Sequence, residues 1–399
     1  MMKDKFIVVG VTGSIAAYKA VELVRLLKKR GAQVQVIMTK EACKFVAPLT
    51  FQVVSQNPVI TDMFQPPYSW DVEHVSLARK ADLFVVAPAT AHIIARISAG
   101  LADDMLTTTI LATKAKVVIV PAMNAHMYEN MVTQRNIKYL NSLGFNVIEP
   151  GTGYLACGES GKGRFPEHGL ILTEIQRTLS SNDLKGKKVL VTAGPTREHI
   201  DPVRFITNLS TGKMGFALAE RAVIRGAEVT LISGSSYLQP PFCLNKFINV
   251  QTAEEMLRCV LDNFKGVDIV IKAAAVGDFK PQKVFSEKIK KTTDKDRLVL
   301  EFEKTPDILY ELGKRKKQQV LVGFAAETNE LIKHAKDKLK HKNLDFIVAN
   351  DITQKGSGFG SDTNVVKIIY KDGSIEELPL MSKYDVADII LDRVLSYIR

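Results

Sequence analysis

The sequence predicts an α/β protein built from two doubly wound, Rossmann-like domains. Short, wholly apolar segments alternate along its 399 residues with longer segments whose apolar residues recur at helical spacing. Segments as apolar as residues 83–86 and 117–120 are typical of strands in a parallel sheet that is buried on both faces. The alternation restarts at Lys188, so we expect two such sheets.

The domain boundary is expected in the polar, turn-rich stretch of residues 181–187, which separates a domain of residues 1–180 from one of residues 188–399. Residues 30–39 resemble residues 225–234, and each segment reads as a helix end followed by the second strand of a nucleotide-binding fold. The length of the chain suits two domains that each bury a core of their own.

The N-terminal half begins with a strand at residues 6–9, a glycine turn, and a helix of residues 15–30 that ends at Gly31. The other elements expected in this half are a strand at residues 34–38 and helices at residues 91–99, 103–113 and 127–142. In a doubly wound domain the ligand binds outside the carboxyl ends of the strands.

The C-terminal half repeats this pattern. Strands are expected at residues 268–272, 320–324 and 345–349, and helices near residues 213–225, 252–264, 328–341 and 383–398. Residues 364–370 and 375–380 flank Asp372 and Gly373, which predicts an antiparallel hairpin at the edge of the sheet.

The composition, with 46% hydrophobic and 24% charged residues, is that of a soluble globular protein. The chain begins without the apolar core of a signal peptide, and no apolar stretch approaches the about 18 residues of a membrane span, so we expect a cytoplasmic protein with no membrane partner. Its four cysteines are far apart, which predicts neither a disulfide framework nor a zinc site. Any metal ion is therefore expected to bind together with a small-molecule ligand.

The net charge of +11 favours anionic partners, which are either phosphorylated small molecules or nucleic acid. The lysine runs at residues 288–291, 314–317 and 333–342 lack the interleaved aromatic residues of a single-strand-binding surface, and no helix-turn-helix or zinc-finger pattern is present. We therefore expect small-molecule substrates and no nucleic acid.

Residues 151–164 place five glycines around a single cysteine, Cys157, and predict a mobile loop in place of a helix or strand. Lys162 and Arg164 nearby would favour the thiolate of Cys157, so the thiol is expected to be reactive; an ordinary glycine-rich surface loop is the alternative. A phosphate-binding P-loop is disfavoured because Ala156 and Gly163 stand where that pattern requires Gly and Ser or Thr.

Residues 10–14 form a glycine turn that is not a dinucleotide fingerprint. The third glycine is missing, and Thr39, not an acidic residue, ends the next strand, so NAD is disfavoured. A backbone-and-hydroxyl cradle at Gly13 and Ser14, before a helix N-terminus, still suits the single phosphate of a mononucleotide such as FMN. A simple tight turn is the alternative.

Two polar side chains stand out in apolar surroundings. Asn124 lies between Met123 and Met127 at a strand end, a position suited to holding a carboxylate or amide. His74 precedes a helical segment; a purely structural role is the alternative for it.

Several multi-residue motifs occur together and in order. They are residues 13–19, 73–75, 87–90, 121–127 and 153–164. Their combination resembles the flavin-dependent cysteine decarboxylases that act on 4′-phosphopantothenoylcysteine, and residues 188–399 resemble the matching phosphopantothenate–cysteine ligase. The whole chain is thus similar to the bifunctional coenzyme A biosynthesis family of bacteria. The resemblance implies a flavodoxin-like flavoprotein domain followed by a ribokinase- or Rossmann-like ligase domain.

The resemblance assigns roles in the N-terminal half. FMN would oxidise the substrate thiol; His74 would be the acid/base of the oxidative decarboxylation, Asn124 would orient the substrate carboxylate, and Cys157 would protonate the product on a closing flap. The implied FMN-binding residues are Gly13, Ser14, Thr39, Ala89, Thr90 and Met123. His92 stands where many relatives have Asn, which leaves its contribution to the flavin site open.

The ligase half would activate 4′-phosphopantothenate as an acyl-cytidylate, with CTP and Mg²⁺, before L-cysteine attacks. Arg204 would bind the substrate phosphate, Asn208 the pantothenoyl group, and Lys288 the reacting centre, although without the resemblance Lys288 reads as a solvated charge. The remaining implied nucleotide-site residues are Ala275, Asp278, Phe324, Lys338 and Lys342. Magnesium is expected to come with the triphosphate, without a protein-only cage.

The family assembles as decarboxylase trimers linked through ligase dimers, commonly dodecamers, so a homo-oligomer with a flavin site between protomers is expected. Two other functions are compatible with the sequence. One is a flavin-dependent peptidyl-cysteine decarboxylase with an inactive C-terminal domain, which would not need Lys288 or Asn208. The other is a basic nucleotide- or nucleic-acid-binding protein without chemistry, which would not be yellow.

Overall fold

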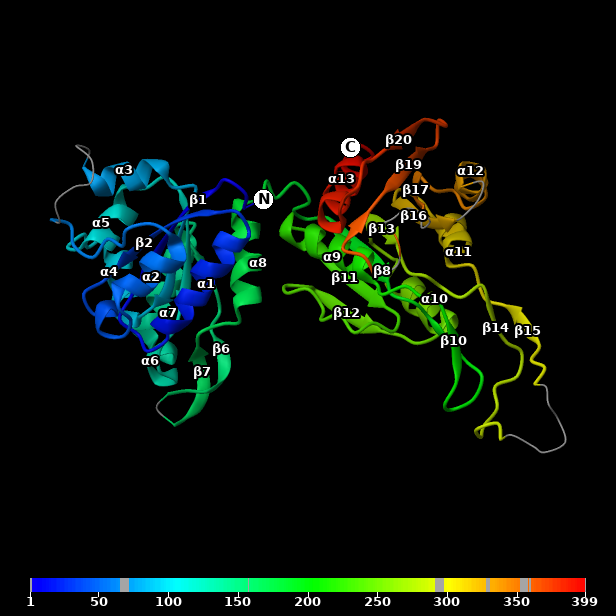
Figure 1. The fold of residues 1–399 in the computed structure, drawn as a ribbon, viewed down its shortest axis with the longest axis horizontal. Helices are drawn as coiled ribbons and strands as arrows, with labels where there is room; N and C mark the ends of the chain where they lie inside the picture. Colours follow the sequence, from blue (N-terminus) through cyan, green and yellow to red (C-terminus); the bar gives the residue numbers. More distant parts are fainter. Residues whose placement is uncertain are drawn as a thin grey trace. The chain divides into compact units, whose positions relative to one another are not determined.

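The structure is a computed structural model that describes residues 2–64, 72–156, 158–290, 298–327, 331–351, 358 and 360–398 (Figure 1). The chain divides into two compact units, Met1–Ser181 and Asn182–Arg399.

The described residues of the N-terminal unit form a five-stranded parallel sheet in the order β2-β1-β3-β4-β5. Its strands are β1 (Phe6–Val11), β2 (Gln33–Met38), β3 (Leu83–Ala89), β4 (Lys116–Pro121) and β5 (Asn146–Val147). This is the flavodoxin-like order, in which the direction of winding reverses between β1 and β3. The predicted doubly wound fold is confirmed, and the ligand crevice belongs at the carboxyl ends of these strands.

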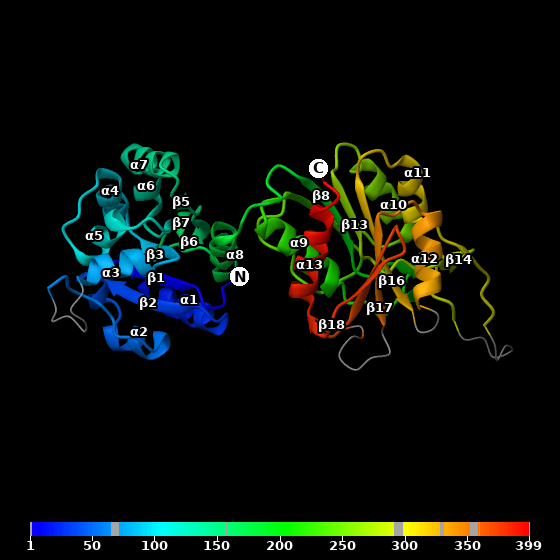
Figure 2. The same ribbon diagram turned by 90° about the horizontal axis from the view of Figure 1, so that it is seen from above.

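Helices cover both faces of this sheet (Figure 2). One face carries α1 (Ala17–Lys29), α2 (Pro48–Ser55) and α8 (His168–Leu179), which bury Leu23, Phe51 and Ile171 against it. The other face carries α3 (Glu73–Lys80), α4 (Ala91–Ala99), α5 (Met105–Ala112), α6 (Ala125–Glu129) and α7 (Met131–Ser142). A short 3-10 helix, Ala42–Lys44, follows β2.

The prediction of one helix over residues 127–142 is wrong, because the segment contains parts of both α6 and α7. Asn130, between them, has an extended backbone, with φ −56° and ψ 133°. Its Oδ1 accepts a hydrogen bond of 2.9 Å from the amide of Val132 and so caps α7. A side chain that satisfies the first amides of a helix favours a new start at that point.

The prediction that residues 151–164 form neither helix nor strand is also wrong. They contain β6 (Gly151–Tyr154) and β7 (Ser160–Arg164), which pair antiparallel with Gly153 opposite Gly161. The glycines allow close packing: a Cβ at Gly161 would lie 2.6 Å from Cβ of Ala125. The lack of a side chain at Gly161 thus allows the β6–β7 ribbon to pack closely against Ala125. Cys157, between the strands, lies outside the described residues.

The C-terminal unit contains an eight-stranded sheet in the order β12-β11-β8-β13-β16-β17-β19-β20. Its parallel strands are β8 (Lys188–Ala193), β11 (Glu228–Ser233), β12 (Lys246–Asn249), β13 (Ile269–Lys272), β16 (Val320–Glu327) and β17 (Phe346–Asp351). They follow the Rossmann order 3-2-1-4-5-6, with the reversal between β8 and β13. The predicted edge hairpin is confirmed as the antiparallel pair β19 (Val366–Tyr370) and β20 (Ile375–Glu377).

Two helical layers sandwich this second sheet (Figure 2). One layer is α9 (Lys213–Ile224) and α13 (Lys383–Leu395); the other is α10 (Ala253–Asp262), α11 (Ile308–Arg315) and α12 (Leu331–His341). The buried Arg225 joins the first layer to the start of the unit, because its guanidinium pairs with Asp183 at 2.9 Å and with Asp392 at 2.8 Å.

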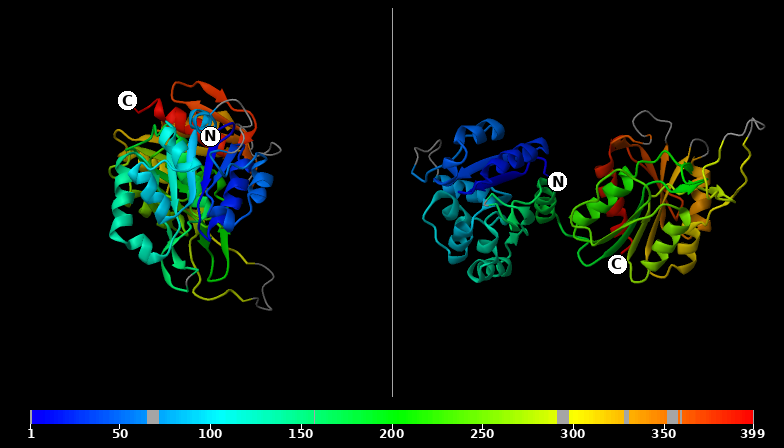
Figure 3. Two further views of the ribbon diagram at one scale, coloured as in Figure 1. Left: turned by 90° about the vertical axis from the view of Figure 1, so that its left-hand side faces the viewer. Right: turned by 90° about the horizontal axis from the view of Figure 1, so that it is seen from below.

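Three short two-stranded ribbons were not expected from the sequence, since strands this short have too little periodicity to detect. They are β9 (Arg197–His199) with β10 (Phe205–Thr207), β14 (Phe279–Pro281) with β15 (Phe302–Lys304), and β18 (Thr363–Asn364) with β21 (Met381–Ser382). The yellow segment containing β14 and β15 extends beyond the second sheet (Figure 3). Within the described ranges, no helix combines the length and hydrophobicity needed to cross a membrane.

Candidate active sites

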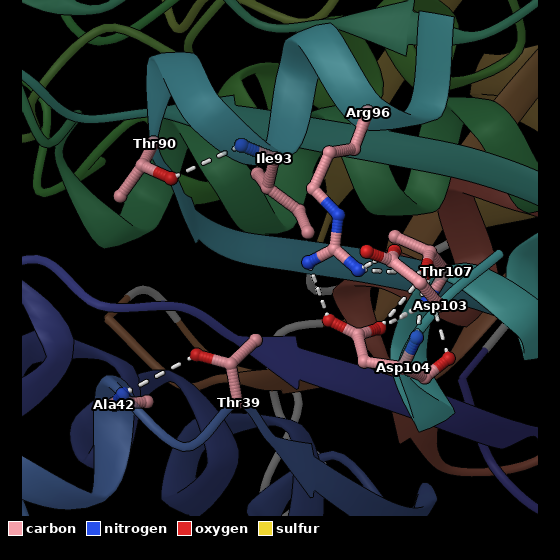
Figure 4. Close-up of polar contacts among 8 residues, drawn as sticks. All are labelled: Thr39, Ala42, Thr90, Ile93, Arg96, Asp103, Asp104 and Thr107. Carbon is pink, nitrogen blue, oxygen red and sulfur yellow. Dashed lines mark hydrogen bonds and ion pairs between the residues drawn. The ribbon is translucent and has the colours of Figure 1, made fainter. Parts of the chain in front are cut away.

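Three hydroxyl side chains order the carboxyl edge of the N-terminal sheet. Thr12 donates a hydrogen bond of 2.7 Å to the carbonyl of Pro88 and accepts one of 3.2 Å from the amide of Thr90. Thr90 caps α4 by accepting from the amide of Ile93 at 3.2 Å, and Thr39 accepts from the amide of Ala42 at 3.3 Å (Figure 4). Thr12 therefore joins the end of β1 to the end of β3, and the hydroxyls of Thr39 and Thr90 order the turns that follow β2 and β3, where flavin-binding residues were predicted.

Figure 4 also shows Arg96, which extends from α4 toward Asp103 and Asp104. Its guanidinium pairs with Asp103 and, at 2.6 Å, with Asp104, the residue that caps α5. The contact joins α4 to α5. Arg96 was not predicted from the sequence, where its only signal is its place seven and eight residues before two adjacent carboxylates.

A cavity of about 640 Å³ lies beside this edge. It is lined by Ser14 at the start of the α1 segment, by Met123 and Asn124 after β4, and by Gly163 and Arg164 of the glycine ribbon. Three predicted site residues, Ser14, Met123 and Asn124, thus share one cavity. Gly13, Thr39, Ala89 and Thr90 lie at the adjoining strand ends but do not line it.

Asn124 is held at its place in this cavity by both ends of its amide. Its Oδ1 accepts a hydrogen bond of 2.8 Å from the amide of His126, which caps α6. Its Nδ2 donates to a carboxylate oxygen of Glu159 at 3.4 Å. The carboxylate of Glu159 shows that this amide can donate to an acid, which is the contact predicted for the substrate.

His74 lies in the first turn of α3 and is half-buried. It is not among the residues that line the 640 Å³ cavity of its own chain. Burial raises the pKa of the neighbouring Glu73 carboxyl. The structure therefore brings Asn124 to the cavity but does not bring His74 to it within one chain; Cys157 lies outside the described residues.

The cavity suits an anionic, aromatic group such as a flavin nucleotide. Among the described residues that line it, none is acidic, whereas Lys19 and Arg164 are cationic. The first turn of α1 likewise carries no acidic residue, and its positive dipole end favours an anion, although the amides of Ala17 and Lys19 already donate to the carbonyls of Ser14 and Ala16 at 2.9 and 3.0 Å. The predicted cofactor therefore fits the residues that are present.

The C-terminal unit has a cavity of about 290 Å³ at the carboxyl ends of its strands. Two predicted residues, Asp278 and Lys342, line it together with Lys272 and Asp307. Lys342 forms an ion pair of 2.7 Å with Asp307. Burial would raise the pKa of Asp307, but hydrogen bonds from Lys342 and the amide of Tyr310, together with the positive charges of Lys342 and Lys272, outweigh burial and lower the pKa overall.

Lys272, which ends β13, was not predicted as a functional residue. A lysine at the end of a buried strand could have indicated it, because parallel strand ends carry ligand sites. Its Nζ donates to the carbonyl of Ala274 at 2.9 Å. Burial, aided by the positive charge of Lys342, lowers the pKa of Lys272 to about 8. The predicted Lys338, half-buried on α12, acts on Lys272 in the same direction. An anion in this cavity would relieve that crowding of positive charge.

The other predicted ligase residues do not line this cavity. Asn208 donates from Nδ2 to the carbonyl of Ala275 at 3.1 Å, which joins two predicted residues directly. Phe324 is half-buried in β16. Lys288 is exposed, in the segment that follows β14.

Arg204 is engaged by a buried carboxylate. Its Nε donates to Asp201 Oδ2 at 2.9 Å, and its Nη2 donates to the carbonyl of Ile289 at 2.9 Å. Asp201 also accepts from the amide of Ile289 at 3.2 Å. Hydrogen bonds from Arg204, and then from backbone amides, hold the pKa of the Asp201 carboxyl well below its usual range. We call these contacts among Asp201, Arg204 and Ile289 the Asp201 clamp. The clamp connects Arg204, the predicted phosphate-binding residue, to Ile289, which follows Lys288 in the chain.

Comparison with known proteins defines the class of each unit. Residues 1–180 match the family model described as Flavoprotein, and residues 184–398 match DNA/pantothenate metabolism flavoprotein C-terminal domain. The class is thus a flavoprotein joined to a pantothenate-metabolism domain. Among the described residues, no group of three or more His, Cys, Asp or Glu side chains lies together in a way that could hold a metal ion.

Full-length relatives define the particular family. The chain is 51% identical over 397 residues to the coenzyme A biosynthesis bifunctional protein CoaBC of Bacillus subtilis (strain 168), covering 99% of this chain and 97% of that protein. It is 44% identical over 399 residues to the protein of that name from Escherichia coli (strain K12), covering 99% and 98%. A solved C-terminal domain of a CoaBC protein is 46% identical, with a TM-score of 0.47, and covers 54% of this chain and 97% of that one. The chain belongs to the family of bifunctional CoaBC proteins of coenzyme A biosynthesis. It is a flavoprotein enzyme that combines a decarboxylase with a ligase.

Proposed function

We propose that the C-terminal unit joins 4′-phosphopantothenate to L-cysteine with CTP and Mg²⁺, and that the N-terminal unit decarboxylates the product to 4′-phosphopantetheine with FMN. The observation that carries the proposal is the pair of cationic cavities at the carboxyl ends of two sheets, one with Asn124 and the other with Asp278 and Lys342. A product that carries both a carboxylate and a phosphate suits the first cavity, and a nucleotide suits the second.

In the decarboxylase, bound FMN would supply the two-electron oxidant for the substrate thiol and later return the electrons. Oxidation of that thiol to a thiocarbonyl lets the carbon–carbon bond to the carboxylate break, because the electron pair moves onto sulfur. Asn124 would donate a hydrogen bond to the departing carboxylate, and His74 would move the proton of the thiol. Cys157 would then protonate carbon, while the β6–β7 ribbon excludes water from the reactive thiocarbonyl.

His74 needs a route to the cavity. Because it does not line the cavity of its own chain, we place the decarboxylase site between protomers of a homo-oligomer, consistent with trimers of this unit linked through dimers of the ligase unit. Each cavity would then receive His74 from an adjacent copy.

In the ligase, a pantothenate carboxylate oxygen attacks the α-phosphorus of CTP and pyrophosphate leaves. The cysteine amine then attacks the acyl-cytidylate, and CMP leaves. Lys342 and Lys338 would neutralise the triphosphate with Mg²⁺, and Lys288 would act at the pentavalent centre. Asn208, fixed by the carbonyl of Ala275, would hold the pantothenoyl group.

The test supplies phosphopantothenate, cysteine, CTP and magnesium to the purified protein and follows pyrophosphate and carbon dioxide. We expect both products in equal amounts, and release of neither would overturn the proposal. Carbon dioxide from peptides that end in cysteine, without pyrophosphate, would favour the peptidyl-cysteine decarboxylase. A colourless protein that binds nucleotide without turnover would favour the binding protein.

A further inference from the structure

Lys272 lies where two predicted parts of the ligase site meet. It ends β13 and lines the cavity of about 290 Å³ together with Asp278. Its Nζ donates a hydrogen bond of 2.9 Å to the carbonyl of Ala274, and the carbonyl of the next residue, Ala275, accepts one of 3.1 Å from Nδ2 of Asn208. Consecutive Cα atoms are about 3.8 Å apart. The ammonium group is therefore next to the point where a pantothenoyl group held by Asn208 would meet a nucleotide in the cavity.

The strand end that carries Lys272 is fixed from both sides. In the parallel sheet, residue 272 lies opposite Thr192 of β8, and β16 pairs with the other edge of β13. Beyond the strand, the amide of Ala274 donates to Oγ1 of Thr192 at 3.3 Å, and the amide of Ala275 donates to the carbonyl of Gly194 at 3.0 Å. A side chain on so constrained a backbone can be held within the narrow tolerance that a reaction step needs.

The charges around Lys272 favour an amine that loses its proton readily. Burial, and then the positive charge of Lys342, lower the pKa of Lys272 to about 8, and Lys338 acts in the same direction. The negative charges of Asp307 and Asp278 oppose this shift without cancelling it. Near pH 8, about half of this lysine is therefore neutral and able to accept a proton.

The other charged groups that line this cavity are less suited to accept a proton. Lys342 forms an ion pair of 2.7 Å with Asp307, which requires the charged form of the lysine. Despite burial, hydrogen bonds led by the one from Lys342 lower the pKa of Asp307, so its carboxylate is a weaker base than usual. Asp278 and Lys304 are exposed. The lysine at the end of β13 is thus the enclosed amine of the site.

The second half of the proposed ligase reaction needs a proton acceptor. The α-amino group of free cysteine is protonated at neutral pH and has no lone pair with which to attack. One proton must pass to a base, after which the nitrogen bonds to the acyl carbon and the bond from that carbon to the phosphate oxygen of CMP breaks. The second proton of the nitrogen leaves with CMP as the amide forms, so protons and charges balance.

We propose that Lys272 is the general base that takes the proton from the cysteine ammonium group, beside Asn208 and the nucleotide cavity. A bound triphosphate keeps the lysine charged through the first half of the reaction. Once pyrophosphate has left, the lysine releases that proton to solvent and accepts one from cysteine. The inference rests on the proposed function of the C-terminal unit and adds a catalytic residue to it.

A second nucleophile separates this role from a structural one. Hydroxylamine is neutral near about pH 7.5, so it can capture the acyl-cytidylate without a base, whereas cysteine needs one. The full chain is supplied with phosphopantothenate, CTP and Mg²⁺, and CMP release is measured with each nucleophile. We expect Lys272→Arg and Lys272→Gln to lower the rate with cysteine roughly hundredfold and to keep the rate with hydroxylamine within about threefold of wild type. Lys367→Arg, at another half-buried strand lysine that does not line the cavity, is the matched control.

The pH dependence is a further readout. The wild-type rate with cysteine should level off above about pH 8, whereas the Lys272→Arg rate should keep rising with the free amine of cysteine, so the deficit should shrink toward about pH 10. A deficit of equal size at every pH, or an equal loss with both nucleophiles, would overturn the inference, and so would a variant that uses cysteine as well as wild type does. If the wild-type protein releases no CMP with either nucleophile, the proposed function of the C-terminal unit fails instead.

Discussion

The carbonyl oxygen of Met123 lies so close to Gly163 that a Cβ at residue 163 would be only 2.3 Å from it. The amide of Met123 also donates a hydrogen bond of 3.0 Å to the carbonyl of Gly163. The glycine ribbon is thereby seated on the loop that presents Asn124. The glycine at this position is required by contact with backbone, which cannot move aside as a side chain could.

Replacing Gly163 by Ala should therefore separate the ribbon from the Asn124 loop. We expect a loss of about 1–3 kcal/mol of stability in the N-terminal unit and at least a tenfold fall in carbon dioxide release. Pyrophosphate release by the ligase unit should continue and serves as the internal control. Gly151→Ala, in the same ribbon, is the matched substitution, because its backbone is not left-handed and the nearest atom would lie 3.6 Å from the new Cβ. Full decarboxylase activity in Gly163→Ala would contradict the proposed packing.

Cys157→Ser should retain the oxidative half of the decarboxylation and fail at the protonation step, because a serine hydroxyl is a much weaker acid than a thiol. Carbon dioxide should appear in a single burst while reduced flavin and an enethiol accumulate, which stopped-flow absorbance can follow. Cys43→Ser, in the same unit, is the control and should turn over normally. Multiple turnovers at the wild-type rate in Cys157→Ser would exclude the proposed proton donor.

Nucleotide binding to the ligase unit should be accompanied by proton uptake at Lys272. The pKa of this lysine is lowered to about 8, and a bound triphosphate would raise it toward the ordinary value of about 10.5. Calorimetry at pH 8.5, in two buffers of different ionisation enthalpy, should detect uptake that is absent in Lys272→Met. Identical uptake in the variant would assign the proton elsewhere.

The same shift has a consequence for stability without nucleotide. Because the folded pKa of Lys272 is below its unfolded value, the unfolded chain binds more protons between about pH 8 and 10.5. This residue therefore makes the unit more stable as pH rises through that window. The unfolding free energy of wild type, minus that of Lys272→Met, should therefore increase as pH is raised from about 8 to 10.5. Urea denaturation at several pH values measures this difference.

Asp201→Asn should release Arg204 and the segment that carries Lys288 from their shared clamp. We expect the ligase KM for phosphopantothenate to rise and decarboxylation of supplied intermediate to stay normal; Asp372→Asn, in the remote hairpin, is the control. The carboxyl pKa of Asp201 is depressed, so its contribution is complete above about pH 4 and is lost only as pH falls through the lowered value. Ligase kinetics indistinguishable from wild type would show that the clamp has no part in substrate binding.

Lys288→Gln should stop pyrophosphate release by at least a hundredfold, because the proposed role requires a positive charge at the reacting phosphorus. Decarboxylation of supplied 4′-phosphopantothenoylcysteine should continue. Lys290→Gln, two residues further along the same segment and also exposed, is the control. Loss of both activities would indicate misfolding, and retention of both would return Lys288 to a solvated charge.

The order of apolar segments was enough to predict both sheets, since a strand buried on both faces needs several consecutive apolar residues whatever surrounds it. The strand ends followed directly, and with them Ser14 and Asn124, which line one cavity. Met123, Asp278 and Lys342, which also line cavities, were implied by the family resemblance. The glycine ribbon was mispredicted for a physical reason. The conformational freedom of glycine disfavours a strand. In this ribbon that cost is outweighed, because only glycine at residue 163 allows the backbone to pack against Met123.

The sequence by itself determined the two-sheet architecture, the strand ends that carry the candidate sites, and the family. Tertiary structure alone decided which distant charges meet: Lys19 with Arg164 in one unit, and Lys272 with Lys342 in the other. Apolar periodicity is local, so it can be read along the chain. A cation that faces another cation across a cavity depends on how the loops between the strands are folded, and no spacing in the sequence records that.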